Sequence, residues 1–330
     1  MSATDAEFAQ RTEPFRRELL AHCYRMTGSL DDAEDLVQDT YVRAWRSYAG
    51  FEGRAPLRAW LYRIATNCCL TALHRHARRS LPSGVAAPAP DADAPAAPPP
   101  PGVVWLQPIP DALAGPASDN PAAVVERRTD LRLALIAGLQ HLPPRQRAVL
   151  ILRDVLGWPA AEVAEALEIS TAAVKSVLQR ARARIREVAP APEDAAEPTA
   201  PEVRSLLDTY MAAFESSDVR VLERVLRADA AIEMAPSPTW FSGLATCVRF
   251  LAASGAMGAA GDWRMLPTSA NGQPAAAAYL RGSAGVHRAY GVALLTTSAS
   301  RIARITVFAE PRLVERFGFP PSLPSQLVRG

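Results

Sequence analysis

The chain has 330 residues, of which 49% are hydrophobic and 21% are charged. This composition excludes a wholly disordered or fibrous chain, and the length predicts two or three compact units. The 36 basic and 34 acidic residues leave a net charge of +2, so the chain as a whole lacks the positive charge typical of nucleic-acid binders.

No apolar run approaches the roughly 20 residues that a membrane span needs, and the first residues carry Asp5 and Glu7 rather than a secretory signal. We therefore expect a cytoplasmic protein with no membrane partner. The cysteines form no C-x-x-C pair, and a zinc site built from Cys68, Cys69, His74 and His76 would need unusual spacing on one helix. We expect no disulfide framework, no metal and no cofactor.

Two changes in composition divide the chain. Residues 82–101 are mostly Pro and Ala and contain no Lys or Arg, which favours an extended, semi-stiff linker. Residues 190–201 form a second Pro/Ala-rich break. The sequence thus predicts helical blocks over 8–80 and 122–188, a third block over 202–320, and linkers over 81–121 and 189–201.

The first block combines an acidic helix with a basic one. Apolar residues at helical spacing predict a helix over 30–48, with Ser29 as its N-cap. Residues 31–39 hold five acidic side chains and no basic one, whereas 54–79 hold six arginines and no acidic residue. We expect a second helix from about 55 to 79. Such polarity is typical of a domain with two different partners, and solvated surface charge is the alternative.

The stretch DDAEDLVQDTYVRAW, followed by PLRAWLYRIATNCCLTALHRHARR, closely resembles region 2 of the extracytoplasmic-function (ECF) sigma factors of bacterial RNA polymerase. In that family the acidic helix docks on the largest subunit of core RNA polymerase. The arginine-rich helix opens the −10 promoter element and captures a flipped base, a task for which arginine and aromatic side chains are suited.

The resemblance implies a role for each matching residue. Facing the polymerase would be Asp32, Glu34, Asp35, Gln38 and Asp39. Near the melted base would be Trp60, Arg63, Asn67 and Cys68. Holding phosphates would be Arg75, Arg78 and Arg79.

Residues 103–113 (VVWLQPIPDAL) are too apolar for a simple spacer because they contain Trp105, Leu106, Ile109 and Leu113. They predict either a short patch that packs on a neighbouring domain or a hook that docks on the C-terminal block or on the polymerase. Sigma-factor subgroups with C-terminal extensions carry a similar segment, which favours docking.

The second helical block predicts a helix-turn-helix. Pro143 and Pro144 suit a helix start and Gly157 a helix end. A helix over 160–167, a turn at 168–170 and a helix from Thr171 follow, with Ser170 or Thr171 as the cap. Residues 174–186 hold five basic side chains and no acidic one, as a helix that enters the major groove requires. The alternative is a generic amphipathic helix.

This block resembles sigma region 4, which binds the −35 element. The resemblance places one group nearest the bases: Thr171, Ala172, Lys175, Ser176 and Gln179. It places Arg180, Arg182 and Arg184 nearer phosphates. The two resemblances together identify promoter DNA, with its −35 and −10 elements, and core RNA polymerase as partners.

The third block predicts helices over 203–215, 219–226 and about 244–253, then antiparallel strands with a hairpin at Asn271 and Gly272. This order gives an α+β cone. The phrases YMAAFESSDVRVLERVLRADAAIEM, PTWFSG and NGQPAAAAY resemble SnoaL-like domains. In some sigma-factor subgroups such domains are fused to the sigma core and adjust its activity.

A cone can hold acid–base chemistry, but fold likeness does not establish it. The candidate side chains form no tight motif: Tyr210, Asp229, Trp240, Asp262, His287 and Tyr290. We assign no catalytic residue and keep Tyr210, Trp240, His287 and Tyr290 as a candidate cavity for a small-molecule ligand.

The whole chain is therefore identified as an alternative sigma factor with two all-α sigma domains and a C-terminal α+β cone that modulates them. It would not be an enzyme. Two alternatives remain: a cone-shaped enzyme or ligand-binding domain with a DNA-binding passenger, and a helix-turn-helix repressor that acts without polymerase.

Overall fold

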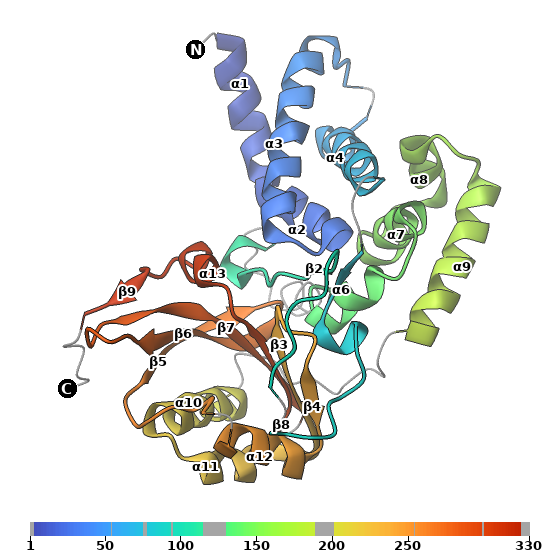
Figure 1. Ribbon diagram of the computed structural model, residues 1–330. Helices are drawn as coiled ribbons and strands as arrows, with labels where there is room; N and C mark the ends of the chain where they lie inside the picture. Colours follow the sequence, from blue (N-terminus) through green and yellow to red (C-terminus); the bar gives the residue numbers. More distant parts are fainter. Residues whose placement is uncertain are drawn as a thin grey trace. The chain divides into compact units, whose positions relative to one another are not determined.

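The computed structural model describes residues 3–53, 55–74, 78–93, 95–114, 130–188, 201–253, 255–298 and 300–324. The chain divides into two compact units (Figure 1). The helical unit comprises Met1–Arg79 and Leu106–Ala191, and the C-terminal unit comprises Ser80–Trp105 and Pro192–Gly330.

The helical unit contains the two blocks that resemble sigma regions 2 and 4. Its first part consists of α1 (Ala3–Thr12), η1 (Glu13–Phe15), α2 (Arg16–Thr27), α3 (Leu30–Ser47), η2 (Tyr48–Gly50) and α4 (Leu57–Leu73). Its second part consists of η4 (Asp111–Leu113), α6 (Leu133–Leu139), α7 (Pro144–Leu150), a π-helical turn η5 (Ile151–Val155), α8 (Ala160–Leu167) and α9 (Thr171–Val188).

The predicted acidic helix is confirmed as α3. The Ser29 hydroxyl accepts a hydrogen bond from the backbone N–H of Asp32 at 3.2 Å, as the N-cap assignment requires. The predicted basic helix is confirmed as α4 but ends at Leu73, earlier than predicted. The helix cannot continue to Arg79 because Arg79 and Ser80 form strand β1 (Arg79–Ser80), which pairs with β2 (Val104–Trp105).

The predicted helix-turn-helix is also confirmed, as α8 and α9. The Ser170 hydroxyl accepts from the backbone N–H of Ala173 at 3.1 Å, so Ser170 caps α9. Between the two helices Glu168 adopts a left-handed conformation with φ of 54°. Val174, Leu178 and Ala181 form the buried side of α9, as the spacing predicted.

Residues 82–101, where they are described, form little regular secondary structure and are mostly exposed, as expected for an extended segment, but they pack on another part of the chain. These residues belong to the C-terminal unit, where Leu81, Pro82 and Ala92 are buried. The sequence argument counted only the segment's own apolar area. It could not see that another part of the chain supplies both an apolar surface and hydrogen-bond partners for the segment.

The C-terminal unit is an α+β fold built on a seven-stranded sheet, with the order β4-β3-β8-β7-β6-β5 and β9 paired to β7. Only β3 and β8 are parallel among these pairs. The strands are β3 (Leu226–Ala235), β4 (Trp240–Ser242), β5 (Trp263–Ala270), β6 (Gln273–Arg281), β7 (His287–Ser298), β8 (Arg301–Phe308) and β9 (Ser322–Leu323). The helices are α10 (Pro201–Ser216), α11 (Val219–Val225), α12 (Leu244–Ala253) and α13 (Pro311–Arg316), with the short turn η3 (Pro82–Gly84).

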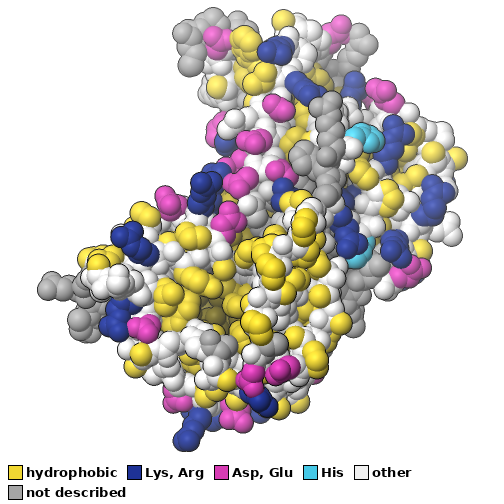
Figure 2. All heavy atoms as spheres, viewed as in Figure 1, with side chains coloured by type: hydrophobic (Ala, Val, Ile, Leu, Met, Phe, Trp, Pro, Cys, Tyr) yellow, Lys and Arg dark blue, Asp and Glu magenta, His cyan; other side chains and the backbone are white. Residues whose placement is uncertain are grey.

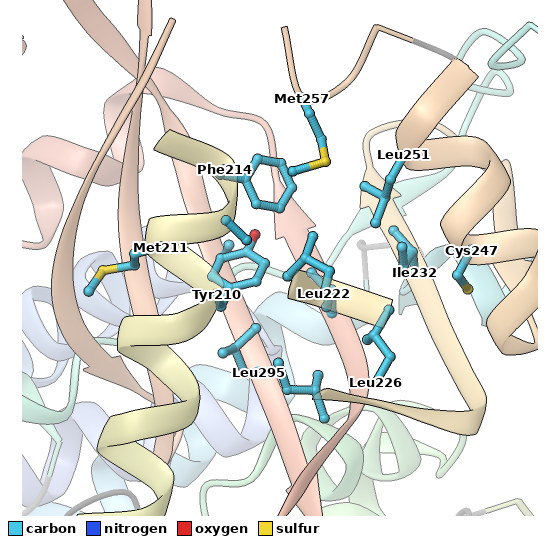
Figure 3. Packing of buried hydrophobic residues seen from close by; sticks show 14 of the residues in the cluster. Tyr210, Met211, Phe214, Leu222, Leu226, Ile232, Cys247, Leu251, Met257 and Leu295 are labelled. Atoms are coloured by element: carbon cyan, nitrogen blue, oxygen red, sulfur yellow. The ribbon is translucent and has the colours of Figure 1, made fainter. Parts of the chain in front are cut away.

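Helices α10, α11 and α12 cover one face of this sheet, as expected for the SnoaL-like cone (Figure 1). The core between them is apolar and includes Tyr210 and Phe214 from α10, Ile232 from β3 and Leu251 from α12 (Figure 3). The predicted hairpin at Asn271 and Gly272 joins β5 to β6, and both residues have positive φ, of 55° and 64°.

A β-bulge in β7 brings Gly291 against the neighbouring strand. The register between β6 and β7 shifts between Ala278, paired with Gly291, and Tyr279, paired with Ala289. A Cβ atom added at Gly291 would lie 2.0 Å from the carbonyl oxygen of Phe308, which is backbone and cannot rotate away. Only glycine therefore fits here without moving β8.

We predict that Gly291→Ala lowers the free energy of unfolding of the C-terminal unit by about 2 kcal/mol or more, because overpacking against backbone forces the strands apart. Thermal unfolding followed by circular dichroism measures the effect. Gly282→Ala is the matched control, since its added Cβ would meet nothing closer than 3.7 Å, and it should change stability little. Equal destabilisation by both variants would contradict the assignment.

Candidate polymerase and promoter interfaces

Helix α3 presents an acidic face to the surface of the helical unit. Asp35, Gln38 and Asp39 are exposed one helical turn apart, while Asp32 and Glu34 are partly buried. Ala33, Leu36, Val37, Thr40 and Ala44 form the buried side of the helix. The periodicity of the sequence was sufficient to predict this partition.

Two apolar side chains extend the same face, and the sequence reasoning missed them. Val42 and Trp45 are 46% and 52% exposed, unusual for such large apolar groups. They follow Asp35, Gln38 and Asp39 at helical spacing, and the indole N–H of Trp45 donates to Asp5 of α1 at 3.1 Å. The signal was present in the sequence, because residues 42 and 45 fall off the apolar stripe. The exposed side of α3 is therefore acidic at its start, and towards its end it presents Val42 and Trp45 together with the exposed Arg43 and Arg46.

The residues predicted to meet the −10 element are only partly exposed on α4. Arg63 and Asn67 are exposed, and Trp60 is half-buried with its ring 4.8 Å from that of Phe51. Cys68 is 2% exposed and faces α3, where burial raises the pKa of its thiol. The structure does not bring Cys68 to the surface, and Arg75 lies outside the described residues.

Two predicted phosphate-binding arginines are engaged within the helical unit. Arg79 forms an ion pair with Asp32 at the start of α3, with N and O atoms 2.7 Å apart. Nη1 of Arg78 lies 3.0 Å from Nδ1 of His141. Burial lowers the pKa of the His141 imidazole, and the positive charge of Arg78 lowers it further. Arg63 also has a loose ion pair of 4.0 Å with Glu165 of α8. The predicted −10 and −35 modules therefore contact one another here.

Helix α9 carries an exposed polar face opposite its buried side. The exposed side chains are those predicted for DNA contact: Thr171, Ala172, Lys175, Ser176, Gln179, Arg180, Arg182 and Arg184. Three of its arginines have partners on the protein surface. Arg182 binds Asp154 through two nitrogens at 2.7 and 2.8 Å. Arg180 donates to the hydroxyl of Ser176, and Arg184 forms an ion pair with Glu187. Both partners of each pair lie on the surface, so such bonds exchange readily for phosphates.

Of residues 103–113, the part from Leu106 onward packs on the helical unit, as the alternative of a short patch on a neighbouring domain predicts, and not as a hook that docks on the C-terminal block or on the polymerase. The side-chain oxygen of Gln107 accepts from the Ser29 hydroxyl at 2.8 Å, and its side-chain nitrogen donates to Asp31 at 2.9 Å. The backbone N–H of Gln107 donates to the carbonyl of Gly28 at 3.0 Å, and its carbonyl accepts from the Tyr24 hydroxyl at 2.8 Å.

Gly28 makes this docking possible. It ends α2 in a left-handed conformation with φ of 70°, and an added Cβ would lie 2.4 Å from Leu106 Cδ2. Leu106 and Ile109 are fully buried. The junction between α2 and α3 covers these two side chains. Neither the C-terminal block nor the polymerase is needed to bury them.

Arg147 of α7 joins the two modules. It is 3% exposed, and its guanidinium donates to the carbonyl of Met26 at the end of α2, to the side-chain and backbone oxygens of Gln140, and to the carbonyl of Leu142. Burial lowers the pKa of Arg147 to about 10, so it remains charged at neutral pH. A second contact between the modules is that of Trp158, whose ring centroid lies 5.8 Å from that of Tyr62 on α4. Sequence reasoning missed Arg147, since nothing local distinguishes it from the other arginines.

The four residues of the candidate ligand cavity do not converge. Tyr210 is buried in the core, and burial raises the pKa of its phenol with a smaller contribution from Tyr290 nearby. Tyr290 stacks edge-on against Trp263 at 5.0 Å. Trp240, however, lies on the edge strand and donates to the carbonyl of Ala86, and His287 lies at 3.0 Å from the carbonyl of Gly261. Tyr210 and Tyr290 are thus the pair that remains together.

The two other candidate carboxylates have structural partners. Asp262 accepts from the backbone N–H of Ala259 and from the Arg281 guanidinium, and these bonds lower its pKa. Asp229 pairs with Arg227. Among the described residues, no cluster of His, Cys, Asp or Glu could hold a metal ion. No described helix is long and apolar enough to cross a membrane.

An acidic helix face and a basic helix-turn-helix in one unit define a DNA-binding transcription factor with a second, protein-binding surface. The family model for Sigma-70 region 2 matches residues 12–79, and that for Sigma-70, region 4 matches residues 132–185. The ECF RNA polymerase sigma factor SigG of Mycobacterium tuberculosis H37Rv is 47% identical over 325 residues, covering 96% of this chain and 85% of SigG. The chain belongs to the family of ECF RNA polymerase sigma factors.

A second relative supports the fold along the whole chain. The ECF sigma factor SigJ of the same organism is 30% identical over 219 residues, covering 66% of this chain and 61% of SigJ. Its crystal structure superposes with a TM-score of 0.60 at 24% identity, covering 95% of this chain and 99% of that one. The predicted class, two helical sigma regions followed by an α+β domain, is confirmed.

We predict that Arg147→Gln destabilises the helical unit by about 2–4 kcal/mol, because the buried carbonyls that it serves lose a charged donor. Urea unfolding of the full chain followed by circular dichroism would show an earlier transition. Arg145→Gln, on the exposed side of the same helix, is the matched control and should shift the transition by less than about 0.5 kcal/mol. If both variants unfold alike, Arg147 does not hold the modules together.

Proposed function

We propose that this protein, as an alternative sigma factor, uses the α3 face to bind core RNA polymerase, α4 to open the −10 element and α9 to read the −35 element. The single observation that carries this division is the separation of charge: α3 exposes carboxylates beside Val42 and Trp45, while α9 exposes Lys175 and its arginines. The first surface suits a basic protein partner with an apolar contact point, and the second suits DNA.

The reaction itself belongs to the polymerase. The sigma factor makes or breaks no covalent bond in this mechanism, and the C-terminal unit acts as a regulator rather than as an enzyme. What supports this is that Asp229 and Asp262 are held in ion pairs and that His287 binds a backbone carbonyl. A small-molecule ligand, if the unit takes one, would contact the aromatic core near Tyr210 and Tyr290.

Promoter binding requires the two modules to separate. Arg63 and Arg78 contact Glu165 and His141 in the present arrangement, so the −10 face of α4 is partly covered by the −35 module. Two different promoter elements cannot be bound by two modules that cover one another. We infer that this arrangement is the free protein and that polymerase binding accompanies opening.

We predict that Asp35→Arg weakens binding to core RNA polymerase about tenfold or more, since a like charge then faces the basic partner surface. Lys175→Ala combined with Gln179→Ala should leave that affinity within about twofold but reduce selection of −35 sequences, because base contacts specify and do not anchor the protein to polymerase. Fluorescence anisotropy with purified core enzyme and run-off transcription from templates with altered −35 elements measure the two effects. Equal loss of core affinity in both variants would contradict the proposed division of surfaces.

We also predict that a chain ending at Ala189 differs at least threefold from the full chain in run-off transcription with core enzyme, because it lacks most of the C-terminal unit. Both chains are compared at equal concentration on one promoter. Identical activity would remove the regulatory role of the C-terminal unit. If neither chain supports initiation while both still bind duplex DNA, the repressor alternative is favoured.

A further inference from the structure

Two buried cysteines lie between α2 and α4, and the proposed function gives neither thiol a role. Cys23 is on α2 and Cys69 is on α4, and each side chain is 0% exposed. Both are free thiols. Figure 2 shows charged side chains over much of the surface of the helical unit, so the pair lies beneath a polar surface.

Contacts between the two helices fix how they are aligned. The Tyr62 hydroxyl of α4 donates to the Glu18 carboxylate of α2 at 3.2 Å. One turn further along both helices, Nε2 of His22 lies 2.9 Å from the hydroxyl oxygen of Thr66. The same step of four residues separates the two contacts on each helix. The helices therefore run in the same direction here, and their next turns also face one another.

These next turns hold the two cysteines. Cys23 directly follows His22 on α2, and Cys69 lies three residues after Thr66, on the same side of α4. The side chains of Cys23 and Cys69 share a hydrogen bond. Two sulfur atoms in such contact need only a small movement to reach the length of a disulfide bond, which is about 2 Å.

A buried positive charge lies beside the pair. Arg147 is 3% exposed, and its Nε–H has no hydrogen-bond partner in the described part of the chain. The hydrogen bond with Cys23 and burial raise the pKa of the Cys69 thiol, and the charge of Arg147 opposes them. A neighbouring cation favours the thiolate, which is the form that attacks an oxidant. Cys69 is therefore the thiol that reacts first, slowly, and Cys23 is in place to react with the product.

We propose that Cys23 and Cys69 form a redox site, at which a hydroperoxide converts the two thiols to a disulfide that joins α2 to α4. With hydrogen peroxide, the Cys69 thiolate attacks one oxygen, the O–O bond breaks, and the released hydroxide takes up the thiol proton to give water. The Cys23 sulfur then attacks the sulfenic acid of Cys69, and the S–OH group leaves as water with the Cys23 proton. Two thiols and one peroxide thus give one disulfide and two molecules of water.

The experiment treats the full chain with excess hydrogen peroxide over hours, blocks the remaining thiols with iodoacetamide and analyses tryptic peptides without reduction. Trypsin releases Cys23 in residues 18–25 and Cys69 in residues 64–75. Mass spectrometry should find these two peptides joined, and the joined pair should fall at least tenfold in Cys69→Ser. Cys68→Ser is the matched control, because Cys68 is equally buried but faces α3, and it should leave the joined pair unchanged.

Thermal unfolding of the same samples gives a second readout. The disulfide closes a loop of roughly 45 residues, so the oxidised wild type should unfold about 5 °C above the reduced protein, and dithiothreitol should reverse the shift. Oxidised Cys23→Ser should show no such shift. The proposal is overturned if peroxide joins no such peptides, if Cys69→Ser forms the joined pair as readily as the wild type, or if the joined protein unfolds at a lower temperature.

Discussion

Buried arginines join the two modules of the helical unit: Arg25 donates to the carbonyl of Asp130, and Arg147 donates to the carbonyl of Met26. A guanidinium withdrawn from water is tolerated only when its N–H groups are hydrogen-bonded. The two terminal nitrogens of Arg147 meet this requirement, with the carbonyls of Met26 at the end of α2 and of Gln140 and Leu142 just before α7, whereas its buried Nε–H has no hydrogen-bond partner among the described residues. Its own module supplies the oxygens of Gln140 and Leu142, and the first module adds the carbonyl of Met26. This bond links the two sequence blocks that resemble sigma regions 2 and 4.

Distant parts of the chain also meet at the start of α3. Gly28 ends α2 and lets Leu106 approach, Ser29 caps α3, and Gln107 binds both Ser29 and Asp31. Arg79 closes the group by pairing with Asp32. Side chains that sequence likeness assigns to polymerase and to DNA thus neutralise one another within the chain. Such a surface is a natural place for regulation, because each partner must be given up before an outside partner can bind.

The C-terminal unit binds a Pro/Ala-rich segment from between the two sigma regions. It offers the segment after Ser80 a buried carboxylate, Glu233, that accepts from Ser83, a backbone carbonyl of Trp240 that accepts from Ala89, and an apolar core that contains Ala92. Its own candidate catalytic side chains are engaged in ion pairs and backbone contacts.

The sequence by itself determined the local elements: the capped acidic helix, the helix-turn-helix with its exposed basic face, and the hairpin at Asn271. These follow from periodicity and capping, which act over a few residues. It did not determine the end of α4, the burial of Cys68, the packing of residues 82–101 on the C-terminal unit or the role of Arg147. Each of these depends on partners far away in the chain. Arg79 pairs with β2 and Cys68 packs against α3. Residues 82–101 contact Trp240, and Arg147 binds the carbonyl of Met26. No local pattern encodes such contacts, because they form only when distant segments pack together.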